Sequence, residues 1–165
     1  MKINKKAMSA VIALMVLILI VIAGTVIIWR VLNKTVDESL SEAKSCYDVL
    51  GKISVNSEYT CYDGANDEMH ISAEVGDIDI DSLFIVIAYE DSATSFELTN
   101  ELTTVANLLS YTRDNQVKAP SKNSGLTYIA TNIVEFPYSI ELSSMVNDNL
   151  CSGETFTDIG FCSAS

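Results

Sequence analysis

The sequence has few of the residues from which most active sites and metal centres are built. Its 165 residues include one histidine, two prolines and four cysteines, and no two cysteines form a CxxC pair. A Ser-His-Asp or Cys-His arrangement would have to use His70, which we expect to be solvated on the polar face of a strand. The chain also lacks an HExxH motif, a phosphate-binding glycine-rich loop and a nucleophile elbow. We therefore expect neither catalysis nor a bound cofactor.

Basic residues are also scarce. Ten Lys and Arg stand against 22 Asp and Glu, which gives a formal charge of −12. This balance argues against nucleic acid as a partner, because its phosphates would be repelled, and ordinary solubility explains the charge. Asp77, Asp79 and Asp81 have the spacing of a calcium loop, but Ser82 and Ala88 stand where such a loop needs Gly and Glu. We expect an acidic strand edge and no metal site.

Long uncharged runs are absent except for one near the start. Met8–Trp29 contains 22 residues without a charge. As a helix it would be about 33 Å long, enough to cross a hydrocarbon core of about 30 Å. It is longer than the apolar region of a secretory signal, about 7–15 residues, so simple secretion is disfavoured. Lys2, Lys5 and Lys6 precede it, and by the positive-inside rule the N-terminus is cytoplasmic and the rest of the chain lies outside.

The helical pattern continues past the apolar run. No proline follows Trp29 until Pro120, and Gly51 is a suitable helix terminator. We predict one helix over residues 8–50, with residues 8–29 in the membrane and residues 30–50 forming an amphipathic stalk. The apolar stripe of this stalk consists of Leu32, Val36, Leu40, Ala43, Tyr47 and Leu50.

Residues 51–165 change to the period of two that is typical of strands. Leu83–Tyr89 is a continuous apolar run, as expected of a strand buried on both faces. Leu102–Tyr111 is ambiguous, and Arg113–Gly125 reads as a surface loop. The chain is thus predicted to be α+β, a long N-terminal helix followed by an antiparallel β-sandwich-like head. The expected strands are Ile53–Cys61, Met69–Val75, Leu83–Tyr89, Phe96–Leu98, Leu126–Val134 and Tyr138–Val146.

All four cysteines follow the apolar run, which favours two disulfides in an oxidising compartment. A Cys46–Cys61 bridge is disfavoured, because a strand from Ile53 would carry Cys61 some 26 Å away at about 3.3 Å per residue. If Tyr138–Val146 runs antiparallel to residues 53–62, Cys46 meets Cys151 and Cys61 meets Cys162. The alternative is a local Cys151–Cys162 bridge, which leaves Cys46 to pair with Cys61.

The residues Lys5, Lys6, Ala7, Met8 and Ser9 form a short basic leader and a small residue directly before the apolar helix. This arrangement resembles the class III signal peptides of archaeal type IV pilins and archaellins. The resemblance implies a cut between Ala7 and Met8, so that residues 1–7 are removed and the apolar helix stays on the mature protein. Bacterial type IV pilins carry Glu five residues into the mature helix, where this chain has Ile12.

The resemblance implies a structural subunit that polymerises through its apolar helix into a type IV pilus-like surface filament for adhesion or motility. Its partners would be other subunits, the membrane, a prepilin peptidase and the pilus assembly machinery. Asn33 begins the sequon Asn-Lys-Thr and is a candidate for N-glycosylation, as is common in archaeal pilins; an unused sequon is the alternative. The alternative function is that of an uncleaved single-pass membrane protein whose extracellular β-domain binds a ligand or partner.

Overall fold

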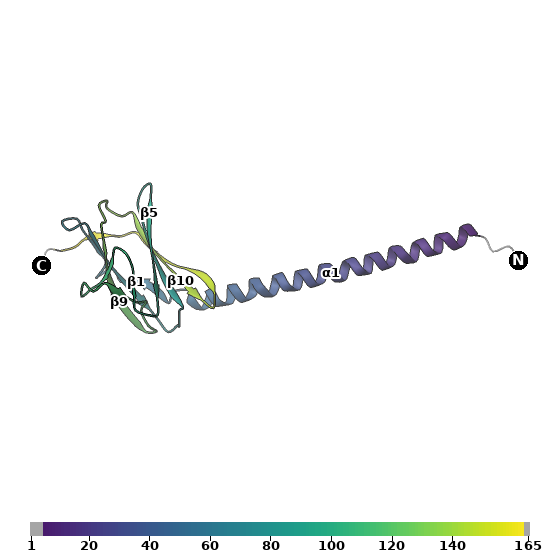
Figure 1. The fold of residues 1–165 in the computed structure, drawn as a ribbon, viewed down its shortest axis with the longest axis horizontal. Helices are drawn as coiled ribbons and strands as arrows, with labels where there is room; N and C mark the ends of the chain where they lie inside the picture. The colour runs from purple at the N-terminus through teal and green to yellow at the C-terminus, as the bar shows by residue number, and fades with distance from the viewer. Residues whose placement is uncertain (1–4, 164–165) are drawn as a thin grey trace. The chain divides into compact units, whose positions relative to one another are not determined.

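The computed structural model describes the backbone of residues 5–163 and the side chains of residues 14–36 and 46–163. Helix α1 (Lys5–Val49) comes first, and all the described strands follow it (Figure 1). The chain divides into two compact units, Met1–Glu42 and Ala43–Ser165. The last helical turns belong to the second unit, which we call the head, where Val49 is only 1% exposed.

The end of α1 is set by local sequence. Gly51 adopts a left-handed conformation with φ of 68°, which glycine enters without a steric penalty. The backbone N–H of Lys52 then donates to the carbonyl of Val49 at 2.9 Å, which closes the turn that follows the helix. The prediction of a single helix ending just before Gly51 is confirmed.

The head is β-rich, and its strands form two larger sheets and one small ribbon in the described residues. One sheet has the order β12, β2, β3, β9, β7, with β1 also beside β3, and the other has the order β11, β10, β4, β5. Pairing is antiparallel except between β12 and β2. The strands of the first sheet are β1 (Ile53–Val55), β2 (Cys61–Asp63), β3 (Glu68–Val75), β7 (Leu108–Ser110), β9 (Ser124–Thr131) and β12 (Gly160–Phe161). Those of the second are β4 (Ser82–Ala88), β5 (Ala93–Thr99), β10 (Ser139–Val146) and β11 (Asn149–Phe156), and β6 (Thr103–Thr104) with β8 (Gln116–Val117) forms the ribbon.

One hydrophobic core serves both larger sheets, and alternate residues of β3, β4 and β10 fill it. In β4, Leu83, Ile85 and Ile87 are completely buried, whereas Phe84 and Val86 between them are half-buried. The run Leu83–Tyr89 therefore has one core face and one partly covered face, rather than two buried faces. The strand that the sequence predicts is present, but its second face packs less closely.

The segment expected as a single strand from Ile53 to Cys61 is interrupted. Asn56 starts a turn in which its side-chain oxygen accepts a hydrogen bond from the N–H of Glu58 at 3.0 Å. Such a turn offers the backbone a local alternative to the sheet ladder. The two remaining pieces, β1 and β2, both pair antiparallel with β3, so the expected hairpin forms in two parts.

The strand partners of β10 also differ from the expectation. β10 does not run beside residues 53–62; it pairs with β4 on one side and β11 on the other, in the other sheet. The unexpected strand β11 follows a two-residue turn, Asn147-Asp148, in which both residues have positive φ. This is the turn geometry that matches the twist of a tight hairpin.

The registers define two ends of the head. At the stalk end, Met145 pairs with Ser82, and the β10–β11 turn lies beside the last residues of α1 (Figure 1). At the distal end, Ser139 pairs with Ala88, and Tyr89 and Tyr138 follow these two residues outward. Six residue steps of β10 separate the two pairs, a distance of about 20 Å at 3.3 Å per residue. The C-terminal strand β12 lies toward the distal end, because it pairs with β2, which itself pairs with the first residues of β3.

Candidate functional site

The most extensive exposed apolar surface of the described residues lies on α1. Leu14–Val36 contains 23 residues and is long and apolar enough to cross a membrane. Large side chains stay exposed around its whole circumference, for example Ile18 at 48%, Leu19 at 65% and Trp29 at 66%. A helix that is apolar on all sides is suited to lipid or to a fully buried position among other helices. This helix is a membrane anchor or a signal sequence.

The few hydroxyls of this segment are satisfied within the helix. Thr25 donates its side-chain hydroxyl to the carbonyl of Ile22 at 2.8 Å, and Thr35 donates to Val31 at 3.0 Å. In lipid, a polar group needs an internal partner, because there is no water to supply one. These bonds allow the helix to be surrounded by hydrocarbon without an unpaired hydroxyl at either position.

The residues of the expected leader lie at the start of α1. The backbone of Lys5, Lys6, Ala7 and Met8 is helical, and their side chains fall outside the described residues. The cut between Ala7 and Met8 stays a prediction. Asn33 is exposed near the end of the apolar segment, and its glycosylation also stays a prediction.

Two disulfides join distant parts of the head. Cys46 is bonded to Cys151 with their α-carbons 5.1 Å apart, and Cys61 is bonded to Cys162 with theirs 4.9 Å apart. We call these the stalk bridge and the tail bridge. The pairs are the ones expected from the sequence, although Cys151 is brought to the helix by β11, which belongs to the other sheet and is not paired with β1. The stalk bridge fixes α1 to the head, and both bridges indicate that the head lies in an extracellular environment.

His70 is less exposed than the sequence suggested. Its side chain is 25% exposed and lies beside the tail bridge, with the ligand atoms of Cys61, His70 and Cys162 all within 4.8 Å of one another. Both sulfur atoms are consumed by the disulfide, so this group is not a metal centre in its oxidised form. The nearby carboxylate of Glu68 is instead held by Arg113 through two hydrogen bonds of 2.9 Å, which raise the pKa of the guanidinium.

The three aspartates of the GDIDIDS segment have separate structural roles. Asp77 pairs with Lys122 at 3.0 Å, and this lowers the pKa of the aspartate while raising that of the lysine. Asp79 lies 3.9 Å from the same ammonium. Asp81 accepts a hydrogen bond from the backbone N–H of Asn147 and so fixes the β10–β11 turn. Two of these carboxylates therefore face Lys122 and the third holds a turn, so the three do not share one point.

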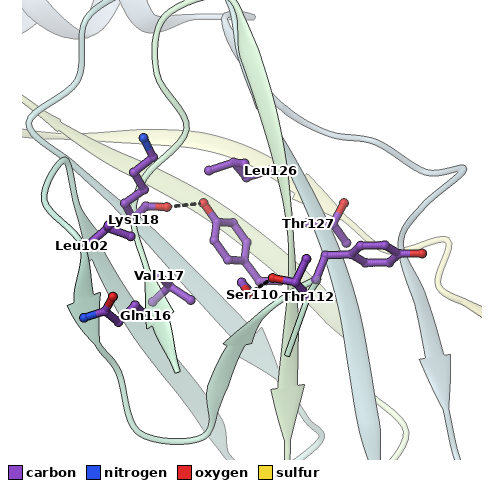
Figure 2. A pocket seen from close by; sticks show the side chains of 10 residues that line it. Leu102, Ser110, Thr112, Gln116, Val117, Lys118, Leu126 and Thr127 are labelled. Carbon is purple, nitrogen blue, oxygen red and sulfur yellow. Dashed lines mark hydrogen bonds between the residues drawn. The ribbon is translucent and has the colours of Figure 1, made fainter. Parts of the chain in front are cut away.

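A small cleft of about 250 Å³ opens between β7, β8 and β9 (Figure 2). Tyr128 lies in it and donates its hydroxyl to the carbonyl of Lys118 at 2.6 Å. Burial raises the pKa of this tyrosine far above its ordinary value, so the hydroxyl remains neutral. The side chains around it are Leu102, Ser110, Tyr111, Thr112, Gln116, Val117, Lys118, Leu126 and Thr127. None of these residues is a carboxylate, a histidine or a thiol.

An aromatic cluster at the distal end was not foreseen from the sequence. The rings of Tyr62, Phe136 and Phe161 contact one another there. Their positions are far apart in the chain, and none continues an apolar periodicity. The only local signal is the Phe-Pro-Tyr sequence at 136–138, which places two aromatic residues in a connection between strands.

Comparison with protein-family models, with curated proteins and with solved structures finds no match for this chain.

Proposed function

We propose that this protein is a subunit of a type IV pilus-like surface filament. In this proposal a cut between Ala7 and Met8 removes residues 1–7, and the mature chain stays anchored in the membrane until assembly. Its helix α1 then packs among other copies in the filament core. The head, with its two larger sheets packed as a β-sandwich, forms the outer surface of the filament. The observation that carries the proposal is a leader-like sequence directly before an apolar helix that continues without a break into a disulfide-bonded head.

The burial requirement of α1 supports this role. Sixteen large hydrophobic side chains between Leu14 and Val36 are exposed in the single chain. Burial of each such side chain is worth about 1.5–3 kcal/mol, so leaving all of them in water would cost roughly 25–50 kcal/mol relative to burying them. The helix must therefore be in lipid or packed against other helices. Transfer from the bilayer to a filament core keeps this surface buried at both stages.

The stalk bridge supports the same role. A filament subunit transmits force between its packed helix and its head, and a covalent link at Cys46 prevents the helix from separating from the sheets. The link is placed three residues before Val49, where the helix enters the head core. An anchor that only tethers a domain does not require such a connection, and a flexible linker would be sufficient.

The mature N-terminus tests the proposal. Intact mass and N-terminal sequencing of protein sheared from the cell surface should give a chain that begins at Met8. Replacement Ala7→Leu enlarges the small residue before the cut and should leave the chain starting at Met1. Replacement Ala10→Leu, three residues into the mature helix, is the matched control and should be processed normally.

The second candidate is an uncleaved single-pass protein with an extracellular binding domain. The apolar segment Leu14–Val36 favours it equally, because a bilayer covers this surface as well as a filament core does. Protein that begins at Met1 in purified membranes, with no processed form in the sheared fraction, would establish this candidate and refute the filament subunit.

A further inference from the structure

The distal end of the head contains an open cleft that none of the features above explains. Its volume is about 820 Å³, within the range of roughly 300–1,000 Å³ that is typical of ligand pockets. It opens between the end of β4 and the connection that leads into β10. Its lining consists of Tyr89, Glu90, Phe136, Pro137, Tyr138 and Thr157.

Aromatic side chains form much of this cleft and remain exposed. Tyr138 is 73% exposed and Phe136 is 47% exposed. Behind Phe136 stand Tyr62, at 5.5 Å between ring centroids and nearly perpendicular, and Phe161, at 5.1 Å. Phe161 is itself 72% exposed. Neighbouring exposed aromatic rings on a small domain indicate a binding surface, whereas a single exposed ring would need no explanation.

The connection that carries these rings is held in place before any ligand arrives. Tyr62 donates its buried hydroxyl to the carbonyl of Ile133 at 3.0 Å, and the N–H of Ile133 donates to the carbonyl of Asp67 at 2.9 Å. At the other end, the N–H of Tyr138 donates to the carbonyl of Ala88 at 2.8 Å. A site fixed at both ends loses little conformational entropy when it binds a ligand.

The charge at the cleft has one sign. Glu90 is part of the lining, and the negative charge of Glu135 contributes to the raised pKa of Tyr89, whose main cause is burial. Neither glutamate has an ion-pair partner among the described residues, and no Lys or Arg lines the cleft. The faces of aromatic rings carry partial negative charge that adds to that of the carboxylates.

We propose that this distal cleft binds an organic cation, specifically an alkylammonium group, between its aromatic rings and beside Glu90. Such a group presents a positive charge spread over an apolar surface, which is what aromatic faces recognise through cation–π attraction. A bare calcium ion would instead need six or more oxygen ligands converging on it. The formal charge of −12 also attracts cations to the whole molecule. The inference does not depend on cleavage or polymerisation.

Choline and its neutral isostere 3,3-dimethyl-1-butanol form a matched pair of probes, since they share a shape and differ in charge. We expect isothermal titration of the full chain in non-ionic detergent to show binding of choline and much weaker binding of the alcohol. Nα-acetyl-lysinamide is titrated in parallel. The tighter binder of the two cations shows whether a choline headgroup or a lysine side chain is the source of the alkylammonium group. Tighter binding of either cation than of the alcohol supports the proposal.

Variants locate the binding to this cleft. Tyr138→Leu should weaken the binding of choline about two- to fivefold, in line with the loss of one cation–π contact at an exposed ring. Glu90→Gln should weaken it and reduce its sensitivity to sodium chloride. Tyr111→Leu replaces a tyrosine that is 68% exposed away from the cleft and should change nothing. Because all three positions are exposed, the fold should be retained, which far-UV circular dichroism checks. Equal affinity for choline and the alcohol, or loss of binding in Tyr111→Leu alone, would overturn the proposal.

Discussion

The second of the two disulfides to form should stabilise the head by less than the first. The stalk bridge closes 105 residues and the tail bridge closes 101. In the chain-entropy model a single loop of this length contributes about 4.8 kcal/mol to the free energy of unfolding. The bridges interlock, however, because Cys61 lies inside the loop of the stalk bridge and Cys162 lies outside it.

Interlocking reduces the effect of removing one bridge. When the stalk bridge is intact, the tail bridge closes a shorter ring that runs from Cys61 back to Cys46, across the bond, and from Cys151 to Cys162. That ring contains about 26 residues, so the second bridge adds only about 3.5 kcal/mol. Either single removal should cost this amount, and removal of both should cost about 8 kcal/mol. A head of ordinary stability, about 5–15 kcal/mol, would be close to unfolded without both bridges.

Urea titration of the full chain in non-ionic detergent, followed by the near-ultraviolet circular dichroism of the head tyrosines, measures these changes. The variants are the paired alanine substitutions at Cys46 with Cys151, at Cys61 with Cys162, and at all four positions. The urea dependence should steepen as bridges are removed, because the unfolded chain expands. Wild-type protein under reductant should match the fourfold variant. Single removals that each cost less than 1 kcal/mol, or a fourfold loss no larger than one single loss, would refute this reasoning.

Three further outcomes are expected. Replacing Lys5 and Lys6 by glutamate should block processing and weaken insertion, since both the leader pattern and the charge asymmetry reside there; unchanged mass and yield of surface protein would show that the leader assignment is wrong. Removal of residues 1–7 takes the formal charge from −12 to −15, because it deletes three lysines and no acid. Filaments should therefore bundle as salt screens their repulsion, and light scattering that is indifferent to sodium chloride would contradict this. Gly153→Ala should destabilise the head by about 1–3 kcal/mol in thermal unfolding, because its new Cβ would overlap the carbonyl oxygen of Leu142; Gly160→Ala, which meets nothing within 4 Å, is the control and should be neutral.

Features that depend on local sequence were predicted well. The helix ends where Gly51 allows a left-handed turn, and the alternating segments around Met69 and Ile140 are strands with their apolar residues in the core. In each case the period of the apolar residues determines the element, and the nearest turn residue determines its end. These signals lie within a few residues of the element they describe.

Features that depend on which strands meet were predicted less well. The neighbours of β10 were misassigned, because every alternating strand of this length has a similar apolar face and pairing is set by the whole arrangement. The missed strand β11 had a usable signal, since Asn147-Asp148 separates two stretches that can form a tight hairpin. The cysteine pairs were nevertheless predicted correctly, because a hairpin after β10 also returns Cys151 to the stalk end.

The distal cleft could not have been read from the sequence. Its walls come from the end of β4, from the connection before β10 and from Thr157 after β11, and Phe161 of the C-terminal strand β12 packs on Phe136. These segments are brought together by the pairing of β10 with β4 and β11, by the pairing of β12 with β2, and by the tail bridge. The site exists only where these segments meet, so the pattern of any one of them does not predict it.

The two bridges therefore hold different parts of the head. The stalk bridge joins α1 to β11, so it bears on the packing of the helix against the sheets. The tail bridge joins β2 to the residue after Phe161, and β12 has only two paired positions of its own. Loss of the tail bridge alone should free β12, remove the ring that supports Phe136, and weaken choline binding. Processing at Ala7 and the stalk bridge should stay intact in that variant, because Ala7 lies far along the chain from Cys61 and Cys162 and the stalk bridge uses neither of these cysteines. Ligand binding and assembly can thus be separated by a single pair of substitutions.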